Sequence, residues 1–126
     1  MWRVHDRIIF ISNLLKNKGF SSILIGLRVG PDEYTGWFKM KGHMQNATVF
    51  IAEYISGGIV RKYSYVLLLD TKPILRYDNA PHFPSLHTFP NHKHYEDKVY
   101  PLEKPRIEIF LEECIKVIKT PKDEVH

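Results

Sequence analysis

Cysteine is scarce in this sequence, and the scarcity limits the sites that the chain can build. Cys114 is the only cysteine among 126 residues, which excludes an internal disulfide and every zinc site made from two or more thiolates. No apolar run approaches the roughly 18 residues of a membrane-spanning helix, and residues 1–7 lack the basic-then-apolar order of a signal peptide. We therefore expect a cytoplasmic protein that does not enter a membrane.

The overall composition is that of a folded domain. Hydrophobic residues make up 44% of the chain and charged residues 25%, which is ordinary globular usage and excludes a disordered or fibrous chain. A length of 126 residues suits one domain and leaves no room for a second. We expect a single domain over residues 1–126.

Charge is distributed unevenly along the chain, whose formal net charge is +4. Residues 1–76 carry eleven Lys/Arg and five Asp/Glu, whereas residues 77–126 carry seven and nine. The basic part permits contact with a polyanion such as nucleic acid, but chance segregation on a solvated surface accounts for the same numbers. Charge alone therefore selects no function.

Two segments show the period of amphipathic helices, one over residues 3–18 and one that begins at Pro105. The apolar residues at helical spacing are Val4, Ile8, Ile11 and Leu15 in the first segment, and Ile107, Phe110, Leu111, Cys114, Ile115 and Ile118 in the second. Both stripes must bury against another layer. Cys114 lies on the second stripe, so we predict a buried side chain and not a nucleophile.

Between the two helical segments, five runs have the character of β-strands. They cover residues 22–29, 35–44, 48–55, 59–69 and 74–77. Because tight turns join consecutive runs, an antiparallel meander is favoured over parallel units, which need intervening helices. We predict an α+β fold with an N-terminal helix, a roughly five-stranded antiparallel sheet, a long ordered loop and a C-terminal helix packed on the sheet.

The long loop, residues 78–104, carries the most unusual feature of the composition. It contains four of the seven histidines, namely His82, His87, His92 and His94. Structureless loops of this length are uncommon in compact domains and are usually functional or disordered. The loop also holds four aromatic residues, whose apolar surface favours a docked, ordered loop.

A cluster of histidines beside a cation suits metal-free cleavage of RNA. One imidazole would deprotonate the ribose 2′-hydroxyl and another would protonate the leaving 5′-oxygen, because histidine exchanges protons near neutral pH. We predict His82, His87, His92 and His94 as acid–base candidates, with Arg76 and Lys93 stabilising charge on the transition state and Asp78 orienting an imidazole. This chemistry needs no metal and no cofactor.

Two other interpretations of the histidines remain open. His92 and His94 share one face if the segment is extended, and His82, His87 and Asp78 could complete a metal site. The spacing matches no zinc signature, however, and a lysine between the two histidines adds unfavourable charge. The histidines could also be structural, capping turns in a proline-rich loop.

A second candidate surface is basic and follows the strands. Lys39, Lys41 and His43 alternate with apolar residues, which places them on one face of an extended run. The predicted nucleic-acid-binding residues are Lys39, Lys41, Arg61, Lys62, Tyr63 and Tyr65, with Trp37 as a further residue for stacking on bases. The simpler alternative is a solvated strand whose lysines prevent edge aggregation.

Three pieces of the chain carry a family resemblance. Tyr-Ser-Tyr at 63–65, Arg-Tyr-Asp-Asn-Ala-Pro-His at 76–82 and Thr-Phe-Pro-Asn-His-Lys-His at 88–94 resemble the TumE-like toxin family of archaea and bacteria. The resemblance extends over nearly the whole chain. It departs at Phe83, where family members often carry a second histidine after the first, so that His82 would act alone at that position.

The resemblance implies the toxin of a type II toxin–antitoxin pair, held inactive by a small DNA-binding antitoxin protein. Many small toxins of this shape are ribonucleases, which is an analogy at the level of the fold. We expect a ribonuclease toxin whose substrate is RNA, free or on the ribosome, and whose chain could form a homo-oligomer. The alternatives are a non-enzymatic module that binds nucleic acid or protein, and a metal-dependent hydrolase.

Overall fold

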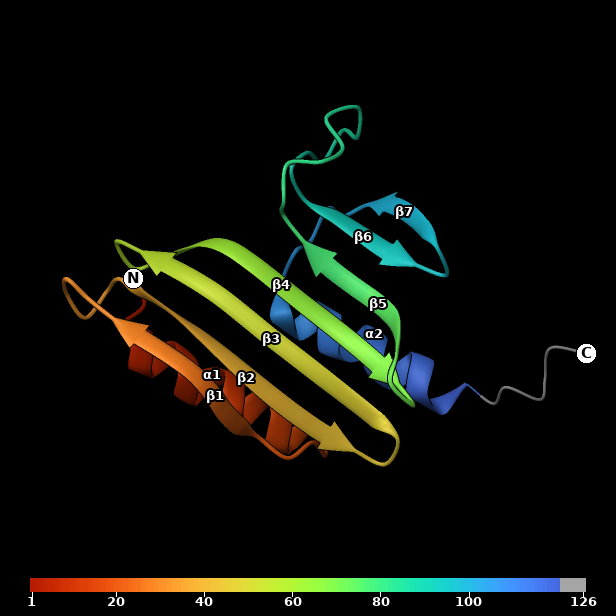
Figure 1. Ribbon diagram of the computed structural model, residues 1–126, viewed down its shortest axis with the longest axis horizontal. Helices are drawn as coiled ribbons and strands as arrows, with labels where there is room; N and C mark the ends of the chain where they lie inside the picture. The colour runs from red at the N-terminus through yellow and green to blue at the C-terminus, as the bar shows by residue number, and fades with distance from the viewer. Residues whose placement is uncertain (121–126) are drawn as a thin grey trace, which may run out of the picture.

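The computed structural model describes residues 1–120, which form two helices and one seven-stranded sheet (Figure 1). The helices are α1 (Val4–Asn17) and α2 (Ile107–Lys119). The strands are β1 (Ile23–Val29), β2 (Gly36–Met44), β3 (Ala47–Ser56), β4 (Ile59–Leu69), β5 (Lys72–Asp78), β6 (His92–Tyr95) and β7 (Lys98–Pro101). Each strand pairs antiparallel with the next one along the chain, so the sheet is a simple meander.

The predicted α+β fold with two terminal helices is confirmed, but five strands is too few. The two additional strands, β6 and β7, form a hairpin inside the stretch predicted as a loop. Each has only four residues, which is too short to show a period. Their turn contains Glu96 and Asp97, both with positive φ, at 50° and 63°, where the common hairpin sequence would be Asn-Gly. Residues 121–126 of the predicted domain lie outside the described part.

Both helices cover the same face of the sheet, and the core lies between them and it. Figure 1 shows α1 behind β1 and β2, and α2 behind β4 and β5. Side chains alternate between faces along a strand, so Phe38 and Met40, Val49 and Ile51, and Tyr65 and Leu67 are buried against the helices. In residues 1–120, no helix covers the other face, which we call the open face.

Helix α2 packs as its stripe predicts. Ile107, Phe110, Leu111 and Cys114 are all fully buried, and Ile115 and Ile118 pack against the core. Burial raises the pKa of the Cys114 thiol, which leaves it protonated and unreactive. None of the helices in residues 1–120 is long and apolar enough to cross a membrane.

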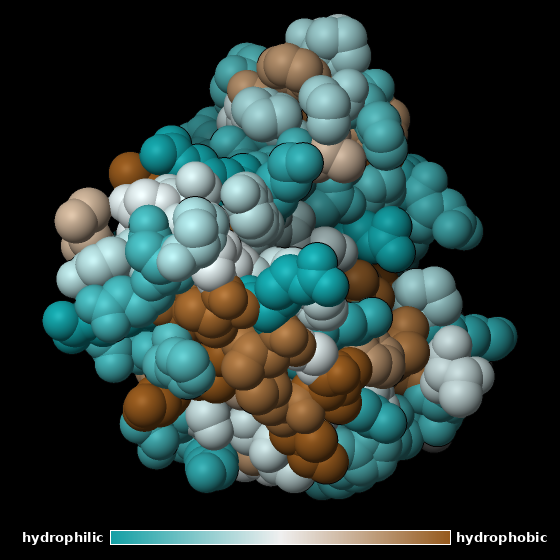
Figure 2. Space-filling view, turned by 60° about the vertical axis from the view of Figure 1, so that its left-hand side comes forward, coloured by the Kyte–Doolittle hydropathy of each residue, from teal (hydrophilic) through white to brown (hydrophobic). Residues whose placement is uncertain are grey.

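Strand β1 forms one edge of the sheet and is unusually apolar for an edge. Ile23, Leu24, Ile25, Leu27 and Val29 are each more than a third exposed, and Ile9 of α1 is exposed as well. Figure 2 brings this side of the molecule forward and shows apolar side chains gathered in a band. Near the opposite edge of the sheet, β6 carries His92 and His94.

Candidate active site

The pairing of β5 with β6 brings four candidate residues onto the open face. Asp78 lies opposite His92, and Arg76 lies opposite His94. Residues two apart on a strand share a face, and directly opposed residues have Cβ atoms about 4.5–5.5 Å apart. A site with two imidazoles, a carboxylate and a guanidinium therefore follows from the strand register.

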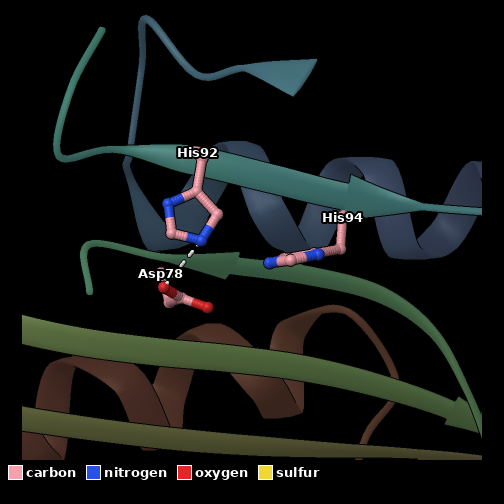
Figure 3. Close-up of side chains that lie close together, drawn as sticks. All are labelled: Asp78, His92 and His94. Atoms are coloured by element: carbon pink, nitrogen blue, oxygen red, sulfur yellow. Dashed lines mark ion pairs between the residues drawn. The ribbon is translucent and has the colours of Figure 1, made fainter. Parts of the chain in front are cut away.

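His92 is the buried centre of this cluster, with 1% of its surface exposed. Its Nδ1 lies 3.0 Å from the carbonyl oxygen of Pro90, and its Nε2 lies 3.0 Å from Oδ1 of Asp78. Figure 3 shows the ring projecting from β6 toward Asp78, with the ring of His94 next along the same strand. The Asp78 oxygen also accepts a hydrogen bond from the backbone N–H of Ala80.

These contacts determine which nitrogen of His92 carries a proton. A carbonyl oxygen only accepts, so Nδ1 donates to Pro90. The contact from Nε2 to Asp78 has the distance of an ion pair but not the angles of a hydrogen bond. The Nε2 atom of His92 therefore faces the Asp78 carboxylate without a hydrogen bond of its own.

His94 is half-buried beside His92. Partial burial lowers the pKa of His94 from its ordinary value of 6.5, and the neighbouring His92, Arg76 and His82 lower it further, while Asp78 opposes them. A lowered pKa keeps the imidazole neutral near pH 7. His94 is therefore able to accept a proton, as a general base must.

The loop between β5 and β6 is held over the cluster by side chains. The ring of Phe83 packs edge-on against His92 and His94, with centroids 4.9 Å and 5.8 Å apart. Asn79 bridges back to β4, accepting from the N–H of Tyr63 and donating to the carbonyl of Arg61. These contacts bring His82, which is exposed and lies beside Phe83, to the edge of the cluster.

A groove of about 700 Å³ opens beside these residues. Of the predicted site residues, it is lined by Arg61, Lys62, Tyr63, Arg76, Asp78, His82 and His94. A second hollow, of about 550 Å³, is lined by residues of β5, of β6 and of the turn after β6. Arg76 and His94 line this hollow as well. The structure thus gathers three predicted catalytic histidines, a carboxylate and two arginines at one place.

Two predicted catalytic residues lie elsewhere. Lys93 falls between His92 and His94, so alternation along β6 turns it to the helix face, where its Nζ lies 3.0 Å from Oε2 of Glu113. His87 is exposed on the loop and pairs with Glu103 at 3.0 Å. Neither Lys93 nor His87 lines the groove that holds Arg76, Asp78, His82 and His94.

The predicted nucleic-acid-binding residues lie on both faces of the sheet. Tyr63 and Tyr65 are only 8% and 1% exposed, because they face the core and pack against one another, and Tyr65 also packs against Phe110 of α2. They cannot stack on bases. Lys39 and Lys41 do project from the open face, with their Nζ atoms 5.2 Å and 5.9 Å from the ring centre of Phe50.

Sequence reasoning missed the asparagines that hold the loop in place. Asn79 continues the pairing of β4 with β5 through its side chain, and Asn91 accepts a hydrogen bond from the Tyr63 hydroxyl at 2.7 Å. The only signal was position, since each asparagine stands next to a strand end. A side-chain amide there supplies the donor and acceptor that the missing strand residue would have given.

Within residues 1–120, one cluster has the composition of a metal site: the ligand atoms of Asp78, His92 and His94 lie within 4.8 Å of one another. The hydrogen bond from His92 to Pro90 is the kind of contact that orients a metal-binding histidine. Against a metal stand Arg76, directly opposite His94, and the Asp78 oxygen already occupied by Ala80.

Comparison with known proteins gives one family. Residues 24–121 match the family model described as Toxin TumE. No curated protein and no solved structure matches the chain.

Proposed function

Because the chain belongs to the TumE toxin family, we propose that it is a toxin that cleaves RNA at the groove lined by Arg76, His82 and His94. The observation that carries the proposal is the groove itself. It places two imidazoles and a guanidinium around a space large enough for a nucleotide, beside the buried pair of His92 and Asp78.

The reaction is an internal transfer at phosphorus. His94, held neutral, takes the proton of the ribose 2′-hydroxyl, and the 2′-oxygen attacks the phosphorus. The bond to the 5′-oxygen breaks, and His82 donates the proton that this leaving oxygen needs. Arg76 stabilises the negative charge on the non-bridging oxygens. The products are a 2′,3′-cyclic phosphate and a 5′-hydroxyl.

His92 and Asp78 act as positioning residues. His92 is too deeply buried to reach a substrate, but its ring packs against His94 with centroids 4.9 Å apart. The ion pair with Asp78 and the hydrogen bond to Pro90 hold that ring still. The pair therefore sets the orientation of His94 and the electric field around it.

A metal-dependent hydrolase is the second candidate, because Asp78, His92 and His94 form the ligand cluster described above. The two mechanisms differ in their products. A metal-activated water leaves no cyclic phosphate, since the 2′-hydroxyl takes no part. We favour the metal-free reaction because Arg76 and Arg61 already supply positive charge at the groove.

Product analysis with metal removal tests the proposal. We expect protein dialysed against EDTA to cleave single-stranded RNA at the same rate as untreated protein and to leave 2′,3′-cyclic phosphate ends. Loss of cleavage in EDTA, restored by zinc or manganese and yielding ends without cyclic phosphate, would establish the hydrolase instead. Intact RNA from folded protein would favour a non-enzymatic binding module.

The pH dependence of cleavage reports on His94. A general base works when it is neutral, so the rate should fall as pH drops through the pKa of His94, which burial and nearby cations place below 6.5. Arg76→Gln removes a group that lowers this pKa and should move the acidic limb of kcat/KM to higher pH. Asp78→Asn removes a group that raises it and should move the limb to lower pH. Shifts in the same direction for both variants would exclude His94 as the base.

We also propose a partner, a cognate antitoxin of the small DNA-binding class, because toxins of such pairs are neutralised by a protein encoded beside them. Coexpression of the adjacent reading frame should restore growth to cells that express this chain. Growth inhibition that persists beside every neighbouring frame would contradict this assignment.

A further inference from the structure

The open face carries two large, partly exposed aromatic side chains that no helix in residues 1–120 covers. Trp37 on β2 and Tyr54 on β3 are directly opposite each other in the strand register and are 43% and 38% exposed. Arg28 on β1 lies opposite Trp37, and Lys62 on β4 lies opposite Tyr54. We call this cross-strand row of Arg28, Trp37, Tyr54 and Lys62 the aromatic row.

The aromatic row joins the groove of the candidate active site. Trp37, Tyr54, Lys62 and Ser64 line a shallow hollow of about 260 Å³. Lys62 and Ser64 also line the groove that holds Asp78, His82 and His94. The two hollows therefore adjoin at β4 on the open face, and we call the pair, which extends from β2 to β5, the trough.

The trough and its surroundings are basic. No ion pair within residues 1–120 involves Arg28, Lys39, Lys41, Lys62 or Arg76. Lys39 and Lys41 lie on the same strand, β2, as Trp37. Two acidic residues line the trough: Asp78, which is paired with His92, and Glu53, which is buried and paired with Arg7. Unpaired cations along a groove attract a phosphate backbone.

Resting on the proposed function, we propose that the aromatic row is a stacking subsite for unpaired bases of the RNA substrate, several nucleotides from the bond that is cut. Aromatic side chains beside cations on a bare sheet bind single-stranded nucleic acid by stacking, which a paired duplex does not permit. Strands β2 and β5 are three strand spacings apart, about 14 Å. An extended strand of a few nucleotides spans that distance, and stacking on the aromatic row requires unpaired bases, so the expected substrate is single-stranded.

Binding of an uncleavable RNA tests this subsite separately from catalysis. A fluorescein-labelled ten-nucleotide 2′-O-methyl RNA lacks the attacking hydroxyl, so its anisotropy reports binding alone. Trp37→Ala and Tyr54→Ala should each weaken binding about 5- to 150-fold, the range found for loss of one stacked base. Trp37→Phe keeps a ring and should recover most of the affinity. Tyr100→Ala is the matched control, because Tyr100 is exposed to a similar degree but lies beside Lys93, and it should bind like the parent.

The outcomes separate the two proposals. Equal binding by Trp37→Ala, Tyr54→Ala and the parent would overturn the subsite even if RNA cleavage is observed. Weaker binding by these variants, in a protein that cleaves nothing, would retain the subsite and remove the ribonuclease. Absence of any RNA affinity in the parent would overturn the subsite and indicate a protein-docking face. Equal affinity for a 2′-O-methyl duplex would overturn the single-strand assignment.

Discussion

His94→Ala should reduce the rate of RNA cleavage by roughly 10²–10⁴-fold, the contribution of a positioned general base. His94 is the one imidazole of the cluster that is both held neutral and open to the groove. Its loss removes the acceptor for the 2′-hydroxyl proton without opening a large cavity, because the ring is only half-buried. The measurement is kcat/KM on a short RNA, with far-UV circular dichroism to show that the variant is folded.

His87→Ala is the matched control for this loss. It removes an imidazole from the same loop, but from a side chain that is 67% exposed and paired with Glu103. The control should cleave at the rate of the parent. If His87→Ala lost activity and His94→Ala retained it, the placement of the chemistry on the open face would be wrong.

Arg7→Leu should destabilise the fold by about 3–5 kcal/mol, the usual result of leaving one partner of a buried ion pair unpaired. The Arg7 guanidinium of α1 binds Glu53 of β3 through two hydrogen bonds of 2.8 Å. Both residues are buried, and the Tyr65 hydroxyl donates to the same carboxylate. Without Arg7, the Glu53 charge lies in the core with a single donor. The free energy of unfolding is measured by urea denaturation.

Two further variants make this result interpretable. Arg3→Leu removes an exposed pair with Glu33 and should leave stability almost unchanged, because solvent screens exposed ion pairs. Glu53→Leu added to Arg7→Leu removes the stranded charge and should recover part of the loss. A change for Arg7→Leu as small as that for Arg3→Leu would show that the buried pair contributes little to the fold.

Arg7 also shows where helical periodicity reaches its limit. The apolar spacing predicted that Val4, Ile8, Ile11 and Leu15 face the core, and three of them do. The fourth buried residue of α1 is Arg7, whereas Ile8 is only partly buried. Hydrophobic patterning carries no signal for an inward charge, because the partner that makes it tolerable lies 46 residues away.

The local pattern of residues determined the layers of the fold. Periods of 3.6 and 2 predicted both helices and the strands β1 to β5, and the tight turns predicted the meander, because these features depend on neighbours a few residues apart. The same pattern determined that His92 and His94 would share a face if the segment were extended.

Only the tertiary structure decided which candidates meet. The pairing of β5 with β6 placed Asp78 and Arg76 opposite the two histidines, and the same alternation turned Lys93 to the helices and the side chains of Tyr63 and Tyr65 into the core. Which face of a sheet is covered depends on where helices far along the chain come to pack. No short window of sequence contains that information. Because neighbouring residues of a strand point to opposite faces of the sheet, a catalytic candidate and a structural residue can be adjacent in the sequence.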